Sequence, residues 1–90
     1  MMKTNTAVKI LSVLAHEGRM SLLQALVQAG DTGTSVSTLA AALGQNVKTV
    51  SAQLQLMADA ELVRCRREGK QMIYRAEYET LGGLFAFIMH

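Results

Sequence analysis

The sequence predicts a single domain over residues 1–90 that is mainly α-helical with a small β-hairpin. Three observations lead to this fold class. The chain has 90 residues, a usual size for one domain. It has no proline and is rich in Ala, Leu, Gln and Met, which favour helices. Two short segments on either side of Glu68-Gly69-Lys70 alternate partly between apolar and polar residues, as the strands of a hairpin do.

The first two helices are expected over about 6–16 and 19–29. In the first, Val8, Leu11 and Leu14 share one face, and neighbouring apolar residues widen that face beyond a single stripe. A helix that is apolar on two sides needs two surfaces to bury against. Glu17-Gly18 separates the helices, and residues 30–35 are expected to form a polar loop.

The next pair, about 36–43 and 47–60, is a short helix, a tight turn and a longer helix. Ser35 and Asn46 can cap the two helices, and Gly44 can end the first in the left-handed conformation. The outward residues of the longer helix are Lys48, Thr49, Ser51, Ala52, Gln53 and Gln55. Their short or hydrogen-bonding side chains suit the DNA major groove, although a merely solvated helix would look the same.

A hairpin is expected next, with strands at about 62–67 and 71–76, which completes a winged helix-turn-helix. Residues 45–75 carry six Lys or Arg against three Asp or Glu, a net +3 that exceeds the +2 of the whole chain. Positive charge gathered on one part of a domain is typical of proteins that bind a phosphate backbone.

The last helix, about 77–88, is apolar around most of its circumference and contains Gly82-Gly83, which requires burial, close approach to another helix or a bend. The whole chain is 50% hydrophobic and only 18% charged, against roughly 25% charged residues on average. We therefore expect part of the apolar surface to lie in a subunit interface.

Several classes are excluded by composition. Charged residues interrupt each apolar run before it reaches the roughly 18 residues that a membrane span needs, and no signal peptide is recognisable, so a cytoplasmic location is expected. Cys65 is the only cysteine, which excludes an intrachain disulfide. No nucleophile and base are paired and no phosphate-binding glycine loop occurs, so an enzyme is not expected.

Five segments in this order, 14–19, 35–44, 49–54, 62–63 and 66–75, resemble the ArsR/SmtB family of bacterial winged-helix repressors. Residues 14–19 are L-A-H-E-G-R, close to the family's inter-helix segment L-A-H-P-x-R. The resemblance implies a homodimer that binds double-stranded operator DNA. The implied DNA contacts are Lys48, Thr49, Ser51, Ala52, Gln53, Gln55, Arg64, Arg66, Arg67 and Lys70. The implied interface of the first and last helices comprises Val8, Leu11, Leu81, Leu84, Phe85 and Ile88.

The family's metal sites are where this chain departs from the resemblance. Ser35-Val36-Ser37 stands where metal sensors carry C-V-C, and hydroxyls are poor ligands for soft metals, so no metal or cofactor is expected. Glu77, Glu79 and His90 keep part of the spacing of a second family site, but solvated carboxylates at a helix start are the ordinary explanation.

Two further residues leave alternatives open. Cys65 shares strand parity with Val63, which suggests a half-buried filler, but its neighbouring arginines would favour a reactive thiolate if the sulfur were exposed. His16 is expected to cap or pack at a helix end.

The function expected is a sequence-specific, homodimeric transcriptional repressor with an unknown inducer. The alternative is a winged-helix protein-interaction module without DNA affinity.

Overall fold

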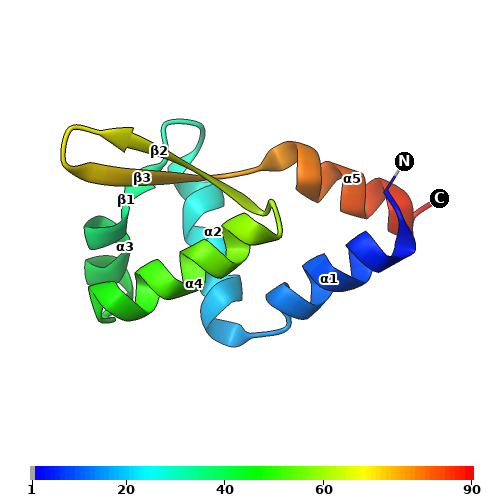
Figure 1. The fold of residues 1–90 in the computed structure, drawn as a ribbon, viewed down its shortest axis with the longest axis horizontal. Helices are drawn as coiled ribbons and strands as arrows, with labels where there is room; N and C mark the ends of the chain where they lie inside the picture. The colour runs from blue at the N-terminus through cyan, green and yellow to red at the C-terminus, as the bar shows by residue number, and fades with distance from the viewer. Residues whose placement is uncertain (1) are drawn as a thin grey trace.

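The computed structural model describes residues 2–90, in which five helices accompany a three-stranded antiparallel sheet. In chain order the elements are α1 (Thr4–Leu14), α2 (Glu17–Ala29), β1 (Thr34–Ser35), α3 (Val36–Leu43), α4 (Val47–Asp59), β2 (Val63–Glu68), β3 (Gln71–Ala76) and α5 (Tyr78–Ile88) (Figure 1). This arrangement confirms the predicted winged helix-turn-helix. The β2–β3 hairpin, residues 63–76, is called the wing below.

Side-chain caps begin three of the helices at the predicted residues. Ser35 Oγ accepts the Thr38 backbone N–H at 3.1 Å, and Asn46 Oδ1 accepts that of Lys48 at 2.7 Å. His16 also acts as a cap, because its Nδ1 accepts the backbone N–H of Arg19 at 3.3 Å. The cap explains why α2 begins at Glu17 and why α1 ends at Leu14 rather than at residue 16.

Strand β1 is the element that the sequence analysis missed, since residues 30–35 were expected to be a loop. Thr34 pairs with Tyr74 and Ser35 with Ile73, so the strand order is β1-β3-β2. A two-residue strand has no periodicity to detect, and it exists only because β3 lies beside it. Gly33 permits this approach: its φ is 72°, and a Cβ there would lie 2.3 Å from the carbonyl oxygen of Tyr74.

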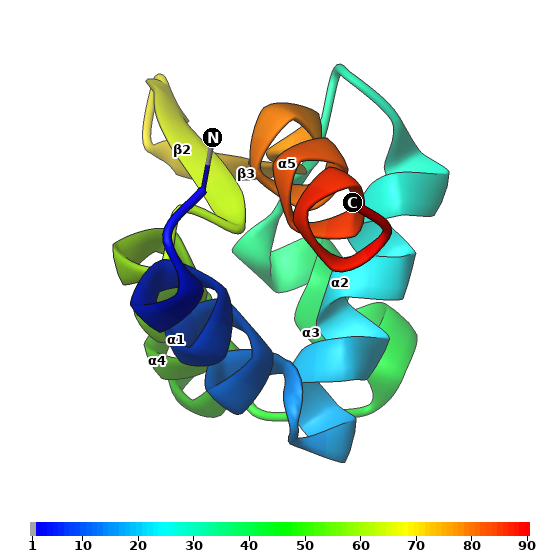
Figure 2. The ribbon, with the colours of Figure 1, turned by 90° about the vertical axis from the view of Figure 1, so that its right-hand side faces the viewer.

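The core runs through the middle of the molecule and receives side chains from all five helices and from the wing. Ile10, Leu26, Leu54, Leu62 and Leu84 are each at most 2% exposed. The molecule is elongated, 40 × 23 × 20 Å, with the tip of the wing at one end and α1 and α5 at the other (Figures 1 and 2). The surface around the wing tip and the surface formed by α1 and α5 are therefore separated along the long axis.

Candidate nucleic-acid interface

Helix α4 is anchored along one side and polar along the other. Val50, Leu54 and Met57 are completely buried, in the spacing that puts them on one face. The opposite side carries four exposed residues, Lys48, Thr49, Ala52 and Gln55, while Ser51 is half-buried. The structure therefore presents most of the predicted DNA-contacting residues of α4 on one outward surface of a firmly packed helix.

Gln53 differs from the prediction that it offers a free amide to a base. Its side chain is half-buried on the flank of α4, and Oε1 accepts a hydrogen bond from Nη1 of Arg19 at 2.8 Å. Sequence spacing placed Gln53 near the outer face but could not show a partner 34 positions earlier in the chain. Arg19 is the last residue of the family-like segment 14–19, and the sequence pattern predicted no role for it.

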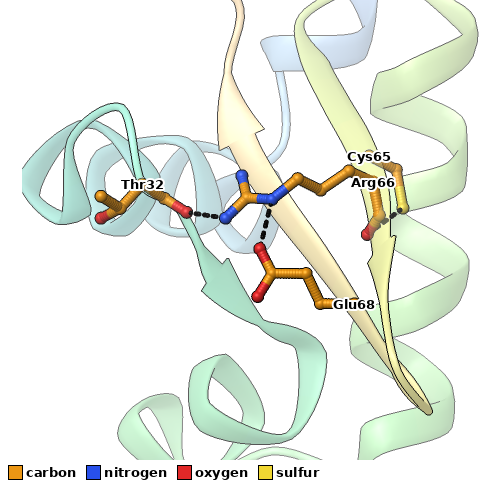
Figure 3. A network of polar contacts seen from close by, with 4 residues as sticks. All are labelled: Thr32, Cys65, Arg66 and Glu68. Atoms are coloured by element: carbon orange, nitrogen blue, oxygen red, sulfur yellow. Dashed lines mark hydrogen bonds and ion pairs between the residues drawn. The ribbon is translucent and has the colours of Figure 1, made fainter.

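The wing holds most of its cationic side chains in contacts within the protein. Arg66 Nε donates to Glu68 Oε2 at 2.6 Å, and its Nη2 donates to the carbonyl oxygen of Thr32 at 2.7 Å (Figure 3). Arg67 Nε donates to the carbonyl oxygen of Gly69 at 3.2 Å. The guanidinium of Arg66 therefore braces the wing against the loop that precedes β1, and it also remains accessible.

Arg64 and Lys70 lie at opposite ends of the wing. Arg64, at the base near α5, forms a 2.7 Å ion pair with Glu77, whose side chain is 12% exposed. Lys70 lies at the exposed turn, and within residues 2–90 it has no hydrogen-bond or ion-pair partner. Of the four predicted wing contacts, Lys70 is thus the one whose charge is unengaged, and Arg64 is the farthest from the tip along β2.

A groove joins the outward side of α4 to the wing. It is lined by Ser35, Val36, Ser37, Val47, Ser51, Lys70, Gln71 and Met72. The start of α3, the start of α4 and the wing turn therefore border one concave surface, although they are far apart in sequence.

Cys65 lies in the wing as the predicted half-buried filler. Its register partner is Tyr74, and both face the side of the sheet that carries buried Val63. Arg64 and Arg66 project to the opposite face because side chains alternate along a strand. Burial raises the pKa of Tyr74, with smaller contributions from the neighbouring Cys65. Only Arg67, of the three arginines invoked for a reactive thiolate, shares the face of the sulfur.

The residues considered for metal binding are not brought together. Glu77 is held by Arg64, and the described part of the chain contains no group of three His, Cys, Asp or Glu side chains that could hold an ion. The hydroxyls that replace the C-V-C cysteines bond to one another: Ser35 Oγ donates to Thr38 Oγ1 at 2.8 Å and lies 3.1 Å from Ser37 Oγ.

The second surface is apolar and lies on α1 and α5, which are side by side at the end of the molecule away from the wing tip (Figures 1 and 2). Val8, Leu11, Phe85 and Ile88 are 44–63% exposed, as expected of an interface. Leu81 is half-buried, and Leu84, at 2% exposed, belongs to the core of the protomer. A groove of about 520 Å³ between the helices is lined by Leu11, Leu14, Ala15, Met20, Leu23, Leu81, Leu84, Phe85 and Ile88.

Over residues 2–90 no helix is both long and apolar enough to cross a membrane.

A helix-turn-helix, a basic wing and a separate apolar face define a winged helix-turn-helix protein of the kind that regulates transcription. The family model described as HVO_A0114 matches residues 5–81, so the chain belongs to that family. The chain is also 36% identical over 80 residues to the HTH-type transcriptional regulator Rv0324 of Mycobacterium tuberculosis. That match covers 89% of this chain but only 34% of the relative's length.

Solved structures show the same fold at similar identity. One is the homodimeric winged helix-turn-helix DNA-binding domain of Mb0332 from Mycobacterium bovis, a possible ArsR-family regulator (TM-score 0.78, 33% identity, 94% of this chain and 76% of that one). Another is the AntR antimony-specific transcriptional repressor (TM-score 0.72, 36% identity, 91% and 73%). These relatives confirm the ArsR-type resemblance.

Proposed function

We propose that this protein is a homodimeric repressor that binds operator DNA with α4 in the major groove and the wing beside the phosphate backbone. The observation that carries the proposal is the anchoring of α4: three completely buried residues hold it while its polar side stays exposed beside the wing. Phosphate contacts are assigned to Lys48, Thr49, Arg67 and Lys70, and groove contacts to Ser51, Ala52 and Gln55. Arg66 braces the wing and adds charge, and Arg64 contributes only long-range charge.

The partner on the apolar face is a second copy of the chain. Exposed Leu11, Phe85 and Ile88 border a groove whose lining is almost entirely apolar, and such a patch is best covered by an equivalent patch in a symmetric dimer. The relative from Mycobacterium bovis is described as homodimeric, which supports this choice. The relatives named above are described as regulators, a DNA-binding domain and a repressor, which favours DNA binding over the alternative of an interaction module without DNA affinity.

Salt dependence of binding tests the proposal. If the dimer neutralises about 6 to 8 phosphates, the logarithm of the binding constant should fall with the logarithm of salt concentration with a slope of about −5 to −7. The measurement is fluorescence anisotropy on a duplex selected by the protein from random DNA, repeated over several salt concentrations. A slope near zero, or failure to select any site, would contradict the proposal.

We propose no soft metal bound by cysteines of one chain as a release signal, because Cys65 is the single cysteine in these 90 residues and soft metals prefer several thiolate ligands. The antimony specificity in the name of the AntR repressor is therefore not carried over to this protein.

A further inference from the structure

Arg19 occupies a corner where three elements meet. Its backbone N–H is accepted by His16, the cap of α2, and its Nε donates to the carbonyl oxygen of Val13 in the last turn of α1. Its Nη1 donates to Gln53 Oε1 on α4 at 2.8 Å. One half-buried side chain thus joins the end of α1 to the middle of α4, beside the start of α2 (Figure 1).

The chemistry of this contact defines its orientation. A guanidinium only donates hydrogen bonds, so the atom of the Gln53 amide that faces it is the oxygen. Because the guanidinium is planar and always charged, its bonds to the carbonyl oxygen of Val13 and to Oε1 of Gln53 have a fixed relative geometry. The contact therefore constrains where α4 lies relative to α1, whereas hydrophobic packing between helices tolerates small shifts.

We infer that Arg19 and Gln53 form a positioning pair that sets the distance between the two recognition helices of the dimer. The inference rests on the proposed function, in which α1 lies in the dimer interface and α4 enters the DNA. A symmetric dimer binds two half-sites whose separation matches the separation of its recognition helices. A constraint between α1 and α4 in each subunit therefore becomes a constraint on operator spacing, and Gln53 acts through Arg19 without touching a base.

The test compares three duplexes: the operator selected by the wild-type protein, the same operator with one base pair inserted at its centre, and one with a single half-site randomised. The variants are Arg19→Lys, Gln53→Ala, their combination, and Gln53→Glu. Lysine lacks the planar fork. Glutamate keeps an oxygen acceptor for Arg19, so it is the matched control for alanine. Melting temperatures show which variants are folded.

The wild-type protein should prefer the native spacing, and Arg19→Lys and Gln53→Ala should each reduce that preference on the order of tenfold, the size of coupling expected between groups in contact. The double variant should lose no more than either single variant, and binding to the single half-site should change little. Gln53→Glu should keep the spacing preference, because it keeps the oxygen acceptor for Arg19. Its negative charge should lower the affinity for all three duplexes by the same factor.

Retention of the spacing preference in Gln53→Ala, or additive losses in the double variant, would overturn the inference. Equal weakening by Gln53→Ala and Gln53→Glu on the single half-site would do so too, because it would assign Gln53 to direct base contact. If Arg19→Lys does not fold, the two Gln53 variants decide the outcome. Wild-type protein that selects no operator refutes the proposed function and this inference together, whereas a normal operator with unaffected spacing refutes the inference alone.

Discussion

The cationic side chains predicted to contact DNA from the wing differ in whether they already have a hydrogen-bond or ion-pair partner within the protein. Three arginines are engaged within the protein, whereas Lys70 at the turn has no partner among residues 2–90. The resemblance implied four equivalent wing contacts, because local spacing does not reveal partners such as Thr32, which lies 34 positions from Arg66. Their contributions to DNA binding should differ accordingly.

Replacement of Lys70 tests this difference. Lys70→Ala should weaken binding to operator and random DNA by the same factor and reduce the salt slope by about one for each subunit on the DNA. Lys3→Ala is the matched control, because Lys3 is an exposed lysine that directly precedes α1, and α1 lies far from the wing tip (Figure 1). A change in base preference in Lys70→Ala, without a change of slope, would show a base contact instead.

Gly33 is the residue on which the position of β1 depends. Gly33→Ala combines a positive φ with a clash against the carbonyl oxygen of Tyr74. Gly44→Ala is the control for φ alone, since Gly44 has a φ of 61° and open space around the missing Cβ. The control should lose about 1–2 kcal/mol of unfolding free energy, and Gly33→Ala should lose clearly more. Urea denaturation measures both, and equal losses would show that the close approach is relaxed at no cost.

Helix α4 owes its start to a local signal and its orientation to distant ones. The Asn46 cap was predictable because a capping side chain acts within three residues. Asn46→Ala should lower the unfolding free energy by about 1 kcal/mol, and Asn46→Asp should preserve it. Thermal and urea unfolding of the two variants provide the measurement. An Asn46→Ala protein as stable as wild type would mean that the rest of α4 holds its first turn without the cap.

The three-stranded sheet shows where sequence patterns stop being informative. The alternation of Val63, Cys65 and Arg67 placed the sulfur on the inward face, and the structure agrees. Strand β1 could not be recognised, because Thr34 and Ser35 become a strand only through hydrogen bonds to β3. Strand β2 is Val63–Glu68, one residue later than the predicted 62–67. The turn before it contains Glu61, whose φ is positive, at 59°.

At the scale of the whole molecule, the wing tip and the apolar α1–α5 face lie at opposite ends of an elongated protomer (Figure 1). The proposed α1–α5 face should therefore control association without belonging to the DNA surface. The scarcity of charge in the sequence predicted such a face. The family resemblance placed Leu84 in it, but the structure buries Leu84 within the protomer. Burial on the inner side of α5 and exposure on its outer side cannot be distinguished when a helix is apolar nearly all round.

Introduction of a charge at Phe85 tests the interface. Phe85 is 63% exposed, so Phe85→Glu should leave the protomer folded but place two carboxylates against an apolar surface in a symmetric dimer. Sedimentation should show monomers, and operator affinity should fall because one subunit binds only one half-site. Ala42→Glu, an exposed position on α3, is the control. An intact Phe85→Glu dimer would show that the interface lies elsewhere.

The sequence alone determined the order of the five helices and the hairpin around Gly69. It also determined the helix caps at Ser35 and Asn46 and the concentration of positive charge near the hairpin. These features depend on interactions between near neighbours and on side-chain periodicity, both of which are visible in one dimension. The Arg19–Gln53 contact, the brace from Arg66 to Thr32, strand β1 and the burial of Leu84 were decided by the tertiary structure. Each of these features depends on residues that are distant in the sequence and that only the packing of the core brings together, so no local pattern predicts it.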